Sequence, residues 1–270
     1  MKIGVFDSGL GGLVIAYSLV SKMPQYDYIY LGDTDRAPYG NRPEREILEY
    51  TSQGVEALFK KGCKLVIVAC NSASADALRV IQRQHLKAWP GCNTLGVLIP
   101  SAEQAVISGQ RIGVICTQAT ADSGAFTREI HKLSATAEVF HKATPRLVDN
   151  IESGQMLLAK HNLQEYLKAF SGHNIDTLVL GCTHYPLLKK EIRGILGDAV
   201  NVISQDEIVP AKLQDYLTRH KEIASDLSTG SNIEFFATKI TPTIKKLACQ
   251  LFSKSVLMEQ IDVVGPSARH

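Results

Sequence analysis

The chain has 270 residues, of which 45% are hydrophobic and 21% charged, and this composition excludes an intrinsically disordered protein. Its length lies between that of one large domain and that of two small ones. The formal net charge is only +2 and the basic residues are scattered, so the charge pattern excludes an extended nucleic-acid-binding surface and favours a small-molecule partner.

The six cysteines stand at positions 63, 70, 92, 116, 182 and 249, and no two of them form a CxxC pair. This spacing argues against a zinc site and a small disulfide framework, so we expect free thiols and no metal. The opening "MKIGVFDSGLGG" lacks the apolar core of a signal peptide, and no apolar run approaches about 18 residues. We therefore expect a cytoplasmic protein with no membrane partner.

Apolar runs rich in β-branched residues recur along the chain and predict buried strands. In chain order they are "KIGVFD", "YDYIYLGD", "KLVIVAC", "NTLGVLIP", "QRIGVIC", "AEVFHKA", "TLVLGC", "NVIS" and "IEFFAT". Most are continuous rather than alternating, as in parallel strands that are covered on both faces. Helical spacing fills the stretches between them, as in "PEREILEYTSQGVEALFKKG". The alternation predicts an α/β fold with mostly parallel sheets.

A weak internal repeat, or echo, of one segment by another predicts two related units. "KLVIVACNSASADAL" and "TLVLGCTHYPLL" share the order strand, cysteine, hydrogen-bonding residues and helix, and "KIGVFDSG" is echoed by "RIGVICTQ". Gly96 and Pro100 indicate the passage into the second unit, and Pro210 the return to the first. We predict two pseudo-symmetric α/β domains, with residues 1–95 plus 208–262 in the first, 96–207 in the second and 263–270 as a tail.

Polar residues at strand ends are the candidates for a functional site, because open α/β sheets bind ligands beyond the carboxyl ends of their strands. The strand-end segments are Asp7-Ser8, Gly32-Asp33-Thr34, Cys70-Asn71-Ser72, Cys116-Thr117 and Cys182-Thr183-His184. An acid, thiols and several hydroxyls together indicate a site.

Cys70 and Cys182 occupy matching strand-to-helix junctions. One thiolate and one thiol facing the same carbon could remove a proton from one face and return a proton to the other. A helix N-terminus lowers a thiol's pKa from its usual ~8.5, so we expect these junctions to favour thiolate. Taken singly, either cysteine is better explained by buried packing, but the matched pair indicates acid–base catalysis. We place Cys63 and Cys249 in helical or linking segments and Cys92 in a loop, and assign them no role.

The segment "DSGLGGL" follows the first predicted strand. It is not a GxGxxG fingerprint, so it does not favour nucleotide binding, although its glycines allow the backbone to approach a small ligand. Asp7 could bind an ammonium group, while Ser8 and the helix N-terminus could bind a carboxylate. The alternative is that both side chains simply cap the helix.

Two further segments hold candidates. "GDTDRAPYG", in which Pro38 and Gly40 flank Tyr39, predicts either a loop over the site or a plain surface turn. "CTHYPLL" adds Thr183 as a hydrogen-bond donor and His184 as a possible acid or orienting group beside the thiol.

Assembled in order, these segments resemble glutamate racemases, the cofactor-independent enzymes that supply D-glutamate for peptidoglycan. The matching segments are "GVFDSGLGGL", "YLGDTDRAPYG", "VACNSASA", "LIPSAE", "GVICTQATADSGAF", "LVDNIESG" and "LGCTHYPLL", which run through most of the chain. The resemblance implies two α/β domains with the active site between them, interconversion of L- and D-glutamate without a cofactor, and a homodimer.

The resemblance also implies roles for individual residues. Cys70 would act on the α-proton of D-glutamate and Cys182 on that of L-glutamate, with Asp7, Glu152 and His184 in supporting acid–base roles. Glu152 matches a family glutamate that lies near the histidine. The implied substrate-binding residues are Asp7, Ser8, Tyr39, Gly40, Asn71, Ser72, Thr117, Thr120, Thr183 and His184.

The sequence departs from the family at Ser72, where threonine is usual, and "KATPRLVDNIESG" lacks a cysteine common before the proline. Three alternatives stay open. The substrate could be aspartate or another small amino acid, the chain could be a binding module for an acidic ligand with structural cysteines, or it could be a cysteine hydrolase.

Overall fold

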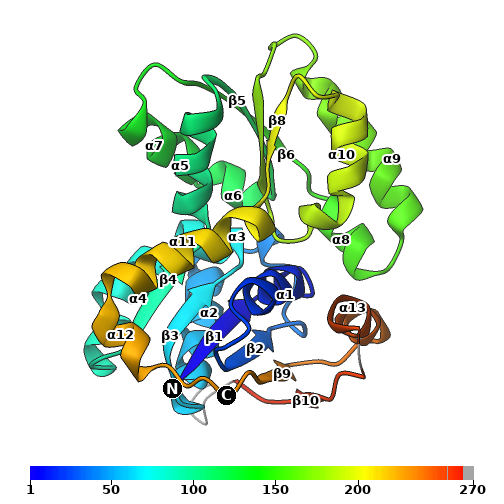
Figure 1. The fold of residues 1–270 in the computed structure, drawn as a ribbon. Coiled ribbons are helices and arrows are strands. Elements are labelled where there is room, and N and C mark those ends of the chain that lie inside the picture. Colours follow the sequence, from blue (N-terminus) through cyan, green and yellow to red (C-terminus); the bar gives the residue numbers. More distant parts are fainter. Residues whose placement is uncertain (254, 264–270) are drawn as a thin grey trace.

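Two parallel sheets, each at the centre of one lobe, form the frame of the molecule (Figure 1). The computed structural model describes residues 1–253 and 255–263. The six-stranded sheet of the first lobe has the order β10-β9-β2-β1-β3-β4, with β1 (Lys2–Asp7), β2 (Tyr28–Gly32), β3 (Cys63–Val68), β4 (Asn93–Gly96), β9 (Ile233–Ala237) and β10 (Met258–Gln260). The four-stranded sheet of the second lobe has the order β6-β5-β7-β8, with β5 (Arg111–Cys116), β6 (Glu138–Ala143), β7 (Thr177–Gly181) and β8 (Asn201–Ile203). The predicted α/β class with parallel sheets is confirmed.

The two sheets share a topology. The order β2-β1-β3-β4 in the first lobe repeats as β6-β5-β7-β8 in the second, so β5 is the counterpart of β1 and β7 that of β3. Cys70 follows β3 and Cys182 follows β7, which places the two cysteines at equivalent strand ends. This repeated topology is the structural counterpart of the internal echo in the sequence. The residue boundaries of the two domains stay a prediction.

Helices cover both faces of the first sheet, which explains why its strands are continuous apolar runs. Ile3 and Val5 share a core with α1 (Gly12–Lys22), α11 (Gln205–Arg219) and α13 (Pro242–Phe252). Phe6 and Val66 face the other way, into a core with α2 (Glu44–Lys60), α3 (Asn71–Asp76) and α4 (Leu78–Arg83). Short elements complete the lobe: η1 (Tyr39–Asn41), η2 (His85–Ala88) and α12 (Lys221–Asp226).

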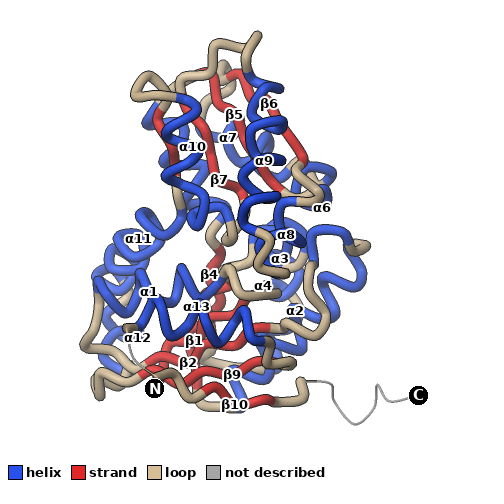
Figure 2. The backbone as a smooth tube through the Cα atoms, turned by 90° about the vertical axis from the view of Figure 1, so that its right-hand side faces the viewer, coloured by secondary structure: helices blue, strands red, loops and turns tan. Residues whose placement is uncertain are grey.

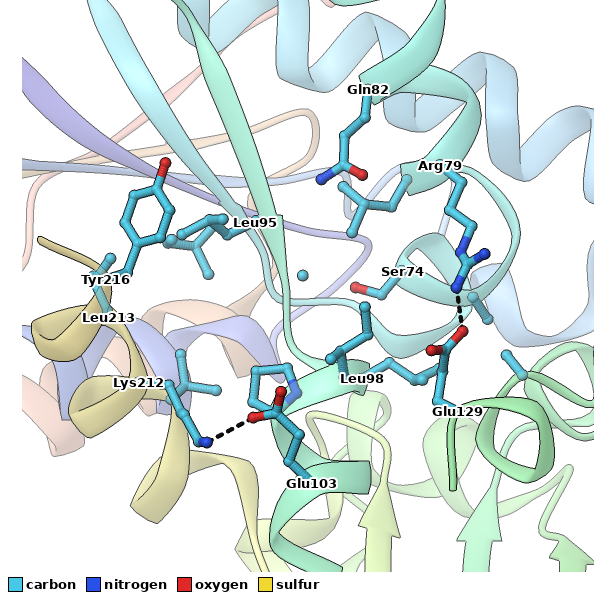
Figure 3. A pocket seen from close by; sticks show the side chains of 18 of the residues that line it. Ser74, Arg79, Gln82, Leu95, Leu98, Glu103, Glu129, Lys212, Leu213 and Tyr216 are labelled. Carbon is cyan, nitrogen blue, oxygen red and sulfur yellow. Dashed lines mark hydrogen bonds and ion pairs between the residues drawn. The ribbon is translucent and has the colours of Figure 1, made fainter. Parts of the chain in front are cut away.

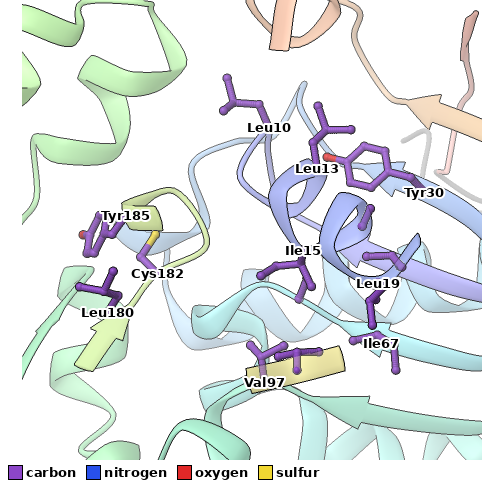
Figure 4. Close-up of a cluster of buried hydrophobic side chains, with 14 of the residues drawn as sticks. Leu10, Leu13, Ile15, Leu19, Tyr30, Ile67, Val97, Leu180, Cys182 and Tyr185 are labelled. Carbon is purple, nitrogen blue, oxygen red and sulfur yellow. The ribbon is translucent and has the colours of Figure 1, made fainter. Parts of the chain in front are cut away.

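The second lobe is layered in the same way. Ile112 and Val114 pack against α5 (Leu98–Ser108) and α7 (Ala125–Leu133), and Leu178 and Leu180 belong to the core that holds α8 (Leu147–Glu152), α9 (Met156–Leu167) and α10 (Lys189–Leu196). The remaining elements are α6 (Gln118–Asp122), η3 (Lys168–Phe170) and η4 (Tyr185–Leu188). Residues of α1 and the loop before it share one apolar cluster with Leu180, Cys182 and Tyr185 of the second lobe (Figure 4), so this cluster joins the lobes.

Two expectations about strands are corrected. The strand expected over 93–100 ends at Gly96, and α5 begins at Leu98. Pro100 lies in the first turn of that helix, where its missing N–H costs nothing, so the apolar run continues as helix. The strand Met258–Gln260 was not expected from the sequence, because it is short, two of its three residues are exposed, and it lies at the sheet edge (Figure 2).

Two further observations concern the cysteines and the tail. Cys63 begins β3, so its expected place in a helical or linking segment is wrong, whereas Cys249 lies in α13. The tail was expected over residues 263–270, and residues 264–270 lie outside the described residues. Within the part of the chain that the structure describes, no helix combines the length and apolar character needed to cross a membrane.

Gly54 of α2 faces the buried ring of Phe6, and a Cβ on it would lie 2.1 Å from Phe6 Cε2. Gly54→Ala should lower the free energy of unfolding by about 1–3 kcal/mol, because the ring is held by the surrounding core. Gly194→Ala is the matched control: the residue is an exposed position of α10 with open space around its Cβ, so alanine should raise that free energy by about 0.5–1 kcal/mol. Denaturant unfolding measures both changes, and a neutral Gly54→Ala would contradict this packing.

Candidate active site

The carboxyl ends of the two sheets meet at the boundary between the lobes. Asp7, the last residue of β1, accepts a hydrogen bond at Oδ1 from Thr183 Oγ1 beyond β7, at 3.2 Å. Across the same boundary, Ser72 Oγ lies 2.9 Å from Thr117 Oγ1. The strand ends that the sequence singled out therefore come together from both lobes.

Asp7 organises the loop that leads into α1. Its Oδ2 accepts hydrogen bonds from the backbone N–H groups of Gly9 and Gly12, both at 3.0 Å. Since Gly12 is the first residue of α1, the capping alternative is correct in part. A Cβ on Gly11 would lie 2.5 Å from Thr183 Oγ1, so glycine is needed here because the loop lies directly against the other lobe.

Burial raises the pKa of Asp7 from 3.8 to about 6. The nearby His184 and the N–H groups of Gly9 and Gly12 act to lower this pKa, and the charge of Glu152 acts to raise it. The cost of removing the carboxylate from water outweighs the hydrogen bonds that it accepts.

Cys70 immediately precedes α3 and is 5% exposed, with Ser8 Oγ 3.3 Å from its sulfur. Burial raises the pKa of the Cys70 thiol to about 12, and the charges of Asp7 and Cys182 add to this rise. Hydrogen bonds from Ser8 and from the Ala73 N–H act in the opposite direction. The expectation that the helix N-terminus lowers this pKa is therefore wrong in its net effect, because desolvation exceeds what the donors contribute.

Cys182 is 6% exposed and faces a different partner, His184. Its sulfur lies 3.5 Å from His184 Nδ1, and His184 Nε2 lies 2.7 Å from Glu152 Oε1. The same Glu152 oxygen accepts a hydrogen bond from the Leu10 N–H at 2.8 Å. Burial acts to lower the pKa of His184, but Cys182 and Glu152 together raise it well above its usual value. His184 thus lies between the sulfur of Cys182 and the carboxylate of Glu152.

Three hydroxyl groups from both lobes form a buried cluster. Ser72 Oγ lies 2.9 Å from Thr117 Oγ1 and 3.3 Å from Thr120 Oγ1, and Thr117 Oγ1 donates to Thr120 Oγ1 at 3.0 Å. A Cβ on Gly40 would lie 2.5 Å from Thr117 Cβ, so η1 closes directly over the cluster. Hydroxyl groups held this way can turn their protons towards an anion.

The loop "GDTDRAPYG" is not a plain surface turn, because Tyr39 and Gly40 are buried. The Tyr39 hydroxyl donates to Asp33 Oδ2, and Arg36 Nε donates to the same oxygen at 2.7 Å. Thr238 Oγ1, just after β9, donates to Asp33 Oδ1 at 3.0 Å. Asp33 therefore anchors the loop, although it was only one of several strand-end residues in the sequence.

Gln205 belongs to the site but was not a candidate from the sequence. Asn71 Nδ2 donates to Gln205 Oε1 at 2.9 Å, and Gln205 Nε2 donates to Asn71 Oδ1 at 2.6 Å. Gln205 lies two residues beyond β8, so the strand-end criterion, applied to "NVIS", would have found it.

A cavity of about 470 Å³ lies on the lobe boundary away from the thiols, and neither Cys70 nor Cys182 lines it. Figure 3 shows two ion pairs across it, Arg79 with Glu129, and Lys212 Nζ with Glu103 Oε2 at 2.6 Å. Among the described residues, no group of three or more His, Cys, Asp or Glu side chains could hold a metal ion.

Known proteins share both the sequence and this two-lobed arrangement. The family model for Asp/Glu/Hydantoin racemase matches residues 20–207. The chain belongs to this racemase family. A glutamate racemase of Aquifex aeolicus is 42% identical over 266 residues, which cover 97% of this chain and 96% of that protein. The resemblance inferred from the motifs is confirmed, and this racemase is an isomerase.

Solved structures of racemases extend the comparison. The crystal structure of glutamate racemase isoform RacE1 from Bacillus anthracis has a TM-score of 0.86 at 31% identity and covers 97% of both chains. A glutamate racemase from Francisella tularensis, solved in complex with D-glutamate, has the same TM-score at 29% identity and the same coverage.

Asp7→Asn should remove one pH dependence of this racemase's stability. The folded pKa of Asp7, about 6, lies above its ordinary value of 3.8, so the folded state binds the proton more tightly than the unfolded state. This tighter proton binding stabilises the folded wild type in full below about pH 4. About 3 kcal/mol of that stabilisation is lost as the pH rises through 6. Asparagine has no such proton. The unfolding free energy of the variant relative to the wild type should therefore increase from about pH 4 to about pH 7 in denaturant titrations, and a constant difference would contradict the assignment.

Proposed function

We propose that this racemase interconverts L- and D-glutamate by proton transfer at the α-carbon. The observation that carries the proposal is the pair of buried cysteines at equivalent strand ends, which converge on one boundary between the lobes. Relatives that carry the name glutamate racemase, and a similar structure bound to D-glutamate, support glutamate as the substrate. Peptidoglycan synthesis, a cytoplasmic location and a homodimer remain predictions from the family resemblance.

The proposed reaction uses the thiols as a base and an acid. The thiolate of one cysteine takes the α-proton, and the electron pair of the broken C–H bond delocalises into the adjacent carboxylate. The thiol of the other cysteine gives its proton to the opposite face of the carbon. One thiolate and one thiol remain with their roles exchanged, so the atoms and charges balance without a cofactor.

The two cysteines have different surroundings that fit opposite starting states for L-glutamate. Cys70, with its raised pKa, is held as a thiol that can donate. We assign Cys182 as the base for L-glutamate because His184, whose pKa is raised well above its usual value, lies 3.5 Å from the sulfur and can donate a hydrogen bond to it. This assignment agrees with the family pattern, in which Cys182 acts on L-glutamate.

The remaining groups match the charges of glutamate. The hydroxyl cluster of Ser72, Thr117 and Thr120 can donate to a carboxylate, as can the amide of Asn71. Asp7 is the buried carboxylate available to an ammonium group, and Thr183 is held beside it. We propose these residues, with Ser8, Tyr39, Gly40 and His184, as the substrate-binding set.

Cys70→Ala and Cys182→Ala should each reduce kcat/KM by about 10²–10⁴-fold in both directions, because each direction needs both a base and an acid. Cys63→Ala is the matched control, since Cys63 is a buried cysteine at the other end of β3. In deuterated water without added pyridoxal phosphate, the wild type should introduce deuterium at the α-carbon of both enantiomers.

Either cysteine variant with near-wild-type turnover would exclude the two-base reaction. A panel of amino acids, tested for α-proton exchange and then analysed by chiral separation, identifies the substrate. Exchange with aspartate but not with glutamate would exclude glutamate.

Glu152→Gln should lower kcat more for L-glutamate than for D-glutamate. Glutamine keeps an oxygen for Leu10 and His184 but lacks the charge that helps to raise the pKa of His184. His184 is then a weaker hydrogen-bond donor to the sulfur of Cys182, the base proposed for L-glutamate. A loss of about tenfold in kcat is expected in that direction. Because the equilibrium constant is fixed, kcat/KM must change equally in both directions, and KM compensates.

Initial rates from each enantiomer, measured by chiral separation, test this asymmetry. Glu165→Gln, an exposed glutamate on α9 of the same lobe, serves as the matched control. Equal losses of kcat in both directions, or no loss, would contradict the role of Glu152.

A further inference from the structure

A buried amide pair joins two parts of the chain that are 134 residues apart. Asn71 is 2% exposed and Gln205 is fully buried. Each side-chain amide donates one hydrogen bond to the other and accepts one, at 2.9 and 2.6 Å. Buried amides of this kind need partners, and here each amide supplies the other with both a donor and an acceptor.

The position of the pair connects it to both cysteines. Asn71 is the first residue of α3 and directly follows Cys70. Gln205 is the first residue of α11, where the chain leaves β8 of the second lobe. Its neighbour Asp206 accepts a hydrogen bond from Lys189 Nζ at 2.7 Å, and Lys189 begins α10 after the Cys182 segment. Gln205 therefore begins the helix that follows the last strand of the second lobe, and this helix, α11, extends along the first lobe (Figure 1).

The pairing has a chemical consequence for Asn71. The ring of two hydrogen bonds uses one of its two amide N–H groups, and the second N–H remains to donate elsewhere. It also fixes the plane of the amide, because rotation of Asn71 alone would bring oxygen against oxygen and nitrogen against nitrogen. Among the described residues, Gln205 is the side chain that hydrogen-bonds the Asn71 amide, and no second one does so.

We propose that Gln205 is a positioning residue for substrate binding: it fixes the Asn71 amide so that the free N–H donates to a carboxylate of the amino acid held beside Cys70. This inference rests on the proposed function. Gln205 itself does not touch the substrate, so its effect is exerted through Asn71.

The test is Gln205→Met, which keeps the length of the side chain but removes both hydrogen bonds. A charge-assisted hydrogen bond that is present before and during the reaction contributes to substrate binding, so KM should rise about tenfold for both enantiomers while kcat changes less than about threefold. Gln214→Met, the same substitution at an exposed position of α11, is the matched control and should leave both constants unchanged.

A double-mutant cycle separates positioning from general damage. If Gln205 acts through Asn71, the double variant Asn71→Ala with Gln205→Met should have the same KM as Asn71→Ala alone, within about twofold. Multiplicative losses would overturn the inference, as would a Gln205→Met variant with unchanged KM and lowered kcat. Thermal unfolding of each variant shows whether it is folded.

If Gln205→Met does not fold, Gln205→Leu is the second variant. Leucine is smaller than methionine and offers Asn71 neither a donor nor an acceptor, so KM should rise here too, and an unchanged KM would overturn the inference. Absence of α-proton exchange in the wild type would overturn the proposed function and this inference together. Wild-type exchange with an unaffected Gln205 variant would overturn the inference alone.

Discussion

The hydrogen bonds that Asp7 accepts hold the strand ends of the two sheets together, and the rest of the site depends on them. One carboxylate oxygen accepts from Thr183 of the second lobe, and the other accepts from Gly9 in the loop of the first lobe and from Gly12, where α1 begins. Glu152 makes the reciprocal connection, because this carboxylate of the second lobe accepts from Leu10 in the same loop. Each lobe thus supplies a carboxylate to donors of the other, and the two cysteines lie beside these links.

Burial in this boundary gives two identical side chains different electrostatic surroundings. Cys70 is surrounded by neutral donors and by the charge of Asp7, and desolvation raises its pKa to about 12. Cys182 faces His184, whose pKa Cys182 and Glu152 together raise well above its usual value. The two sheets share an order of four strands, whereas the charge arrangement differs between the two cysteines. A reaction that needs one base and one acid requires such a difference in every cycle.

Much of the fold could be predicted because it depends on local pattern. All nine expected strands exist, since continuous apolar runs are typical of strands covered on both faces. Where the pattern failed, packing decided the outcome. The run that contains Pro100 becomes helix after Gly96, and the edge strand Met258–Gln260 has two exposed residues and so no apolar signature.

The candidate site, like the fold, could be predicted only where it depends on local sequence pattern. The sequence by itself determined that Cys70 and Cys182 end equivalent strands, because strand periodicity and the internal echo are properties of neighbouring residues. Only the tertiary structure decided that Gln205 pairs with Asn71 and that burial outweighs the helix N-terminus at Cys70. Both depend on which distant segments pack together and exclude water, and the spacing of residues along the sequence does not predict this packing.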